Sequence, residues 1–139
     1  MTIKEYLNRS RYLDREIDAK IDHLERIDSM VNRVTPVLSD MPADPSRDNH
    51  KREKLLVKMI DLKWEINEQI DELVDTKREI NKLIEKIPTK EHKLLLELRY
   101  VNLFSWEKIS EQMDISLRHV YRLHGAALLE ADKVWRNMG

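Results

Sequence analysis

The 139-residue chain has no cysteine, only two glycines and a single phenylalanine. The absence of cysteine excludes disulfides and thiolate metal ligands. No apolar run approaches the roughly 18 residues that a membrane-spanning helix needs, and the N-terminus lacks the apolar stretch of a signal peptide. These absences predict a cytoplasmic protein with no membrane association.

The residues that are abundant favour helices. Charged residues make up 37% of the chain and apolar residues 41%, a composition typical of long helices with a solvated face and unlike that of a sheet protein. The 25 basic and 26 acidic residues give a net charge of −1, which does not by itself indicate nucleic-acid binding. Any basic surface must therefore arise from the local arrangement of side chains. We expect an all-α fold.

The first half of the chain predicts a helical hairpin over residues 1–87. Thr2 and Glu5 have the spacing of a capping box, and apolar residues then recur at helical spacing as far as Val34. Three prolines in residues 35–48 predict a loop. A second helix is expected at about 49–87, where apolar residues recur every seven positions, as in a coiled coil. That seam comprises Met59, Ile66, Leu73, Ile80 and Ile87, with Leu55, Leu62 and Leu83 in the matching register and Ile70, Val74 and Ile84 beside it.

Residues 88–139 predict a trihelical domain that follows the hairpin. Helices are expected near 89–102, 105–113 and 116–134, and Thr89, Ser105 and Ser116 are the residues expected to cap them. Leu95, Leu98 and Val101 should face the other two helices, with Leu94 and Tyr100 at the border. The last two helices are joined by the short break Asp114-Ile115-Ser116. Two helices joined in this way predict a helix-turn-helix, whose second helix normally enters the DNA major groove.

The outward face of that second helix is the candidate DNA-reading surface. It comprises Leu117, Arg118, His119, Tyr121 and Arg122, none of them acidic. Arginine can donate two hydrogen bonds to guanine in the major groove. Helix N-termini offer free amides to anions, so phosphate contacts are expected from Ser105, Lys108 and Ser116. The alternative interpretation of these residues is an ordinary solvated helix face.

An enzymatic function is not expected. His119 and His124 are five residues apart, so they do not share a helix face as a metal-binding pair would. The chain has no glycine-rich phosphate loop, and its carboxylates fall on the charged faces of the expected helices. We therefore predict no catalytic residue, no cofactor and no metal site.

The segment LLLELRYVNLFSWEKISEQMDISLRHVYRLHGAALL, residues 94–129, resembles region 4 of sigma-70 type factors. The resemblance implies that Leu117, Arg118, His119, Tyr121 and Arg122 form the base-reading face. Leu117 and Tyr121 depart from the usual polar character, so a −35 element is not implied as the target. No sigma region 2 is present, which argues against a complete sigma factor.

The whole chain, including VTPVLSDMP and the C-terminal Y-R-L-H-G-x-A-L, is similar to small phage-encoded proteins grouped near the ArpU/RinA-like late transcriptional regulators. This resemblance implies a phage or prophage transcription regulator in the cytoplasm of a bacterial host. The hairpin would make a homodimer or dock on RNA polymerase. An alternative remains open, in which the chain is a protein-interaction module that binds RNA polymerase or another phage protein and makes no base contacts.

Overall fold

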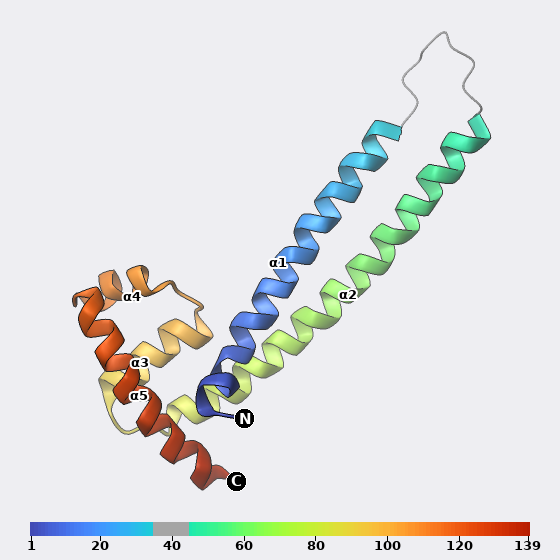
Figure 1. The fold of residues 1–139 in the computed structure, drawn as a ribbon. Coiled ribbons are helices and arrows are strands. Elements are labelled where there is room, and N and C mark those ends of the chain that lie inside the picture. The colour runs from blue at the N-terminus through green and yellow to red at the C-terminus, as the bar shows by residue number, and fades with distance from the viewer. Residues whose placement is uncertain (35–44) are drawn as a thin grey trace. The chain divides into compact units, whose positions relative to one another are not determined.

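The computed structural model describes residues 1–34 and 45–139, and over these ranges its regular secondary structure is helical, without a strand (Figure 1). The predicted all-α fold is confirmed. The two long helices are α1 (Ile3–Val34) and α2 (Pro45–Glu85), and they pair with each other. Residues 45–48, expected in the loop, instead form the first turn of α2. Proline is accepted there because the first helical N–H has no intrahelical partner. Residues 35–44 of the predicted loop lie outside the described residues.

The chain divides into two compact units, and the division falls within both long helices rather than at residue 88. One unit comprises residues 15–71, and the other comprises residues 1–14 together with 72–139. The boundary expected at 87–88 was placed where one helix ends and the next begins in the sequence. The compact units instead group residues that pack together, so residues 1–14 belong with residues 72–139.

In the unit of residues 15–71, α1 and α2 run antiparallel and share an apolar seam. Gln69 donates to Glu16 at 2.6 Å, and the Lys20 ammonium lies 3.8 Å from the Glu65 carboxylate. The pairing of later α1 residues with earlier α2 residues defines the antiparallel direction. The seam is formed by Ile17, Ile27, Val31, Leu62 and Ile66, all buried. Ile70, expected to widen the seam, is 41% exposed.

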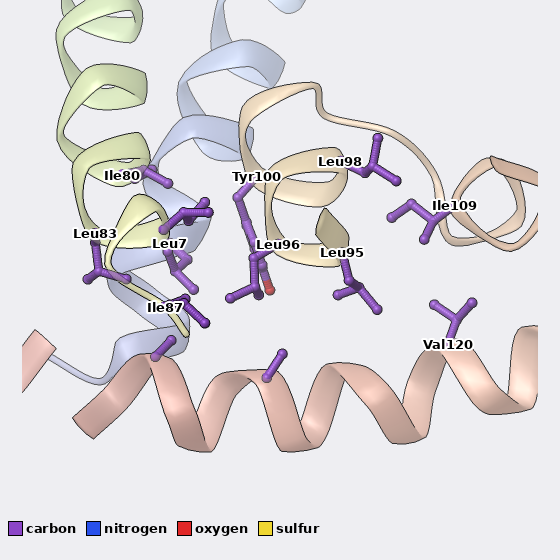
Figure 2. Packing of buried hydrophobic residues seen from close by; sticks show 13 residues of the cluster. Leu7, Ile80, Leu83, Ile87, Leu95, Leu96, Leu98, Tyr100, Ile109 and Val120 are labelled. Atoms are coloured by element: carbon purple, nitrogen blue, oxygen red, sulfur yellow. The ribbon is translucent and has the colours of Figure 1, made fainter. Parts of the chain in front are cut away.

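The second unit surrounds the larger core, which Figure 2 shows from close by. It contains the base of α1 and α2, then α3 (Lys90–Leu96), the π-helix η1 (Glu97–Val101), α4 (Trp106–Met113) and α5 (Leu117–Met138). The core combines residues from every one of these elements: Leu7, Ile80, Leu83, Ile84, Ile87, Leu95, Leu96, Leu98, Tyr100, Ile109, Val120, Ala127 and Ala131. The three C-terminal helices therefore do not enclose a core by themselves. Val74, expected beside the seam, is 44% exposed.

The predicted helix at 89–102 is regular only as far as Leu96. Beyond it the chain widens into η1, where the amide of Asn102 donates to the carbonyl of Glu97, five residues back. A π-turn advances each residue by a smaller angle than an α-turn, so an extrapolated 3.6-residue period fails here. As a result Tyr100 is buried, where the sequence predicted it at the border. Leu94, predicted at the same border, lies in the regular part of the helix and is 46% exposed.

The carbonyl of Tyr100 accepts a hydrogen bond from the Ser10 hydroxyl of α1 at 2.7 Å. Ser10 is fully buried, and its hydroxyl satisfies a carbonyl at the irregular end of η1. This bond ties the first turns of α1 to the segment that leads into α4. At the start of α1, the predicted capping box is confirmed by the reciprocal bonds between Thr2 and Glu5.

Candidate nucleic-acid interface

Helices α4 and α5 are joined by a turn whose geometry follows from three residues. The Ser105 and Ser116 hydroxyls accept from the third amide of their helices, at 3.2 Å and 3.1 Å respectively, which confirms both predicted N-caps. Asp114 ends α4 in the left-handed conformation (φ 53°, ψ 48°), which aspartate tolerates better than most residues. The chain can therefore reverse within three residues and begin α5 at once.

One face of α5 anchors it to the core. Val120, Ala127 and Ala131 are fully buried on that face, and Leu123 is partly buried. Ile109 of α4 is also fully buried in the same cluster. Since α5 is held from behind by this apolar stripe, its opposite face is fixed toward solvent.

The candidate base-reading residues lie on that solvent face. Arg118, His119, Tyr121 and Arg122 are exposed, and Leu117 is half-buried. Among the described residues, neither Arg118 nor Arg122 has a hydrogen-bond or ion-pair partner for its guanidinium group. The donors of these two arginines are therefore available to a ligand.

The candidate phosphate contacts also lie at the surface. Ser105, Lys108 and Ser116 are exposed, and they belong to the N-terminal ends of α4 and α5. The Lys108 ammonium rests 3.9 Å from the ring centroid of Phe104, so its charge is positioned but still accessible.

Gly125 lies three residues beyond Arg122 on the exposed side of α5. A Cβ atom added there would have no neighbour within 4 Å, and the residue has no positive φ. Nothing that packs against it within the described residues requires a glycine.

A buried polar cluster behind α5 was not anticipated from the sequence. The Tyr100 hydroxyl and His124 Nε2 are 2.7 Å apart, and the His124 ring packs edge-on against Trp106 with centroids 4.6 Å apart. The Arg99 guanidinium lies over the ring of Trp106, 3.8 Å from its centroid. Tyr121 also contacts Trp106 edge-on, at 5.7 Å between centroids. The cluster links η1, α4 and α5, and so it sets the position of the candidate reading face.

Burial determines the protonation of this cluster. It lowers the pKa of His124 from 6.5 to about 4, assisted by the positive charges of Arg99 and Lys4. It also raises the pKa of Tyr100 to about 12. Both groups are therefore neutral at neutral pH, and their hydrogen bond carries no charge. One sequence signal was present: His124 falls on the apolar stripe of α5 between Val120 and Ala127, where a polar group needs a partner.

Thr89 occupies the N-cap position of α3 but does not cap it with its side chain. Its hydroxyl donates to Glu130 of α5 at 2.8 Å, and its amide donates to the same carboxylate at 3.1 Å. These bonds, led by the one from the Thr89 hydroxyl, lower the pKa of Glu130. The expectation of a capping hydroxyl was therefore wrong, because the hydroxyl is turned toward a carboxylate of a distant helix, to which it donates a charge-assisted hydrogen bond.

The described residues contain no cluster of His, Asp and Glu arranged to hold a metal ion. None of the helices within residues 1–34 and 45–139 is both apolar and long enough to span a membrane.

The fold and the surface together define an all-helical protein that ends in two helices joined by a tight turn, with two unpaired arginines on the outer helix. The family model described as "Protein of unknown function (DUF1492)" matches residues 45–132, and the chain belongs to this family. The matched range includes every candidate contact residue from Ser105 to Arg122. Comparisons with curated proteins and with solved structures found no match.

Proposed function

We propose that this protein is a sequence-specific DNA-binding transcription regulator of phage or prophage type, with α5 as the helix that enters the major groove. The observation that carries the proposal is the state of Arg118 and Arg122. Both are exposed on a helix that is anchored from behind, and no acidic residue lies on α5 before Glu130. A guanidinium with free donors in this position suits the two acceptors of a guanine edge.

The roles of the individual residues follow from their places on the two helices. Arg118 lies in the first turn of α5, where recognition helices usually meet the bases, and Arg122 lies one turn further on. Ser105, Lys108 and Ser116 would contact phosphates from the ends of α4 and α5. Tyr121 and His119 border this face, and half-buried Leu117 would pack against a base or sugar. The role requires neither catalysis nor a cofactor.

The test is a selection of bound sites from random duplexes, followed by affinity measurements on the selected site. Arg118→Ala and Arg122→Ala should each weaken binding by roughly ten- to a hundredfold, the discrimination expected from a bidentate base contact. Arg136→Ala is the matched control, because it removes an exposed arginine from the far end of α5 and should leave affinity unchanged. Unchanged binding by both Arg118→Ala and Arg122→Ala would refute the assignment.

A second candidate function is a protein-interaction module that binds RNA polymerase or another phage protein without base contacts. It is favoured by Leu129, an apolar side chain of α5 that is 71% exposed, and by the half-exposed ring of Tyr121. The salt dependence of binding distinguishes the two functions. Affinity for duplex DNA should fall steeply with salt if phosphates are contacted. The absence of any salt-sensitive DNA binding, together with capture of polymerase that depends on Leu129, would favour the second function.

A further inference from the structure

Helix α2 carries a second apolar stripe on the side facing away from its seam with α1. Val57, Ile60 and Trp64 are spaced by three and four residues, so they share one face, and Leu56 borders them. Their exposed fractions are 56%, 57%, 67% and, for Leu56, 39%. The buried seam residue Leu62 lies on the opposite side of the same helix. A tryptophan left two-thirds exposed within such a stripe is typical of an interaction surface.

The two ends of this stripe along α2 carry net charges of opposite sign. Residues 51–58 contain four basic residues and one acidic residue, a net charge of +3. Residues 61–72 contain five acidic residues and one lysine, a net charge of −4. The sign therefore changes near Ile60, in the middle of the apolar stripe. Lys58 and Glu65 lie toward α1, where they line one hollow with Lys20. The charges nearest the stripe are therefore Arg52 and Lys54 at one end and Glu68 and Asp71 at the other. Reversing one copy brings these opposite charges together.

We propose that this face of α2 is a homodimer interface, in which the α2 helices of two copies pack antiparallel about a two-fold axis near Ile60. Val57 of one copy would then lie against Trp64 of the other, and the reciprocal contact would follow by symmetry. Each basic segment would face an acidic segment of the partner copy. A parallel arrangement would place like charges together and is disfavoured.

The two properties of the surface have different roles. Burial of the apolar stripe supplies the association energy, since exposed ion pairs contribute little. The charges select the antiparallel direction and make association sensitive to salt. An anionic membrane is a poor occupant, because the acidic half of the stripe would be repelled. The interface lies within residues 51–72, so the inference does not depend on DNA binding and its test needs no DNA.

The first experiment measures the mass of the full chain in solution by sedimentation equilibrium. The wild-type chain should be a dimer, and Trp64→Glu should raise its dissociation constant by at least about 30-fold, as loss of an aromatic hot spot does. Leu129→Glu is the matched control, because it places the same charge at another exposed apolar position. A monomeric wild-type chain, or a dimer divided by Leu129→Glu and left intact by Trp64→Glu, would overturn the proposal.

The second experiment tests the direction of pairing without altering the apolar stripe. Arg52→Glu with Lys54→Glu, and separately Glu68→Lys with Asp71→Lys, should each weaken self-association, and mixing the two variants should give a heterodimer. Because the chain has no native cysteine, His50→Cys and Asp71→Cys, which the same pairing places opposite each other, can be introduced singly. A mixture of these two variants should cross-link as a heterodimer through a short bismaleimide. Cross-linking only between identical positions would indicate parallel packing and refute the proposed direction.

Discussion

The burial of His124 should make the stability of the protein depend on pH. Its side chain is only 9% exposed, and it is held between the Tyr100 hydroxyl and the Trp106 ring. Protonation would place a cation in an apolar core that already lies near Arg99 and Lys4. The perturbation of interest is therefore a fall in pH from neutral, compared between the wild-type chain and His124→Gln.

The sign of the effect follows from the two pKa values. The folded pKa of His124 is about 4 and the unfolded value is 6.5, so between them the unfolded chain binds a proton that the folded chain does not. The contribution of His124 to the free energy of unfolding is therefore fully present above the unfolded pKa. It is lost as the pH falls toward the folded pKa. The whole difference corresponds to about 3 kcal/mol, of which about 2 kcal/mol falls between about pH 7 and pH 5.

The assay is urea denaturation followed by circular dichroism at several pH values between about 7 and 5. Wild-type stability should decrease over this window, whereas His124→Gln should be less stable at neutral pH and nearly flat over the same window. His119→Gln, which removes an exposed histidine from the same helix, should keep the wild-type slope. Parallel profiles for the wild-type chain and His124→Gln would refute this account of the buried cluster.

Three further substitutions test the elements that position α5. Gly125→Ala should raise the free energy of unfolding by about 1 kcal/mol, because the added methyl meets no neighbour and alanine favours the helix; a lower melting temperature would contradict this. Ser116→Ala should lower the free energy of unfolding by about 1 kcal/mol through loss of the bond to the His119 amide, and Ser116→Asp should retain most of it in the same melts. Leu7→Ala should cost about 2–5 kcal/mol in urea denaturation since Leu7 is fully buried, whereas Tyr12→Ala on the exposed side of α1 should cost little.

Local signals in the sequence predicted most of the helices correctly. The capping residues Thr2, Ser105 and Ser116 stand where their helices begin, because a hydroxyl or carboxylate at that position acts within one turn of the chain. The apolar period of α2 also identified its seam, since burial of one stripe is a property of the helix itself. The exposure of Arg118 and Arg122 follows from the same periodicity.

The contacts that the sequence did not reveal are those between distant residues. The bond from Ser10 to the Tyr100 carbonyl joins residues 90 positions apart, and it exists only because η1 interrupts the regular helix. The bonds from Thr89 to Glu130 similarly depend on how α3 meets α5. Periodicity assigns a face to each residue, but it does not identify the partner across that face. For this reason the Tyr100–His124 cluster behind the candidate reading helix also escaped prediction.

The position of α5 depends on the N-terminal end of the chain as well as on its own domain. Leu7 is fully buried in the core that holds α5, and Tyr6 packs against Trp135 of α5 with ring centroids 5.2 Å apart. The family match begins at residue 45 and so does not include either of these N-terminal residues. Residues 88–139 alone would lack Leu7, Ile80, Leu83 and Ile84, which belong to the same buried core as the apolar residues of α3 and α5. The base of the helical hairpin is thus a structural part of the proposed DNA-binding unit, and residues from both ends of the sequence fix the surface proposed to read DNA.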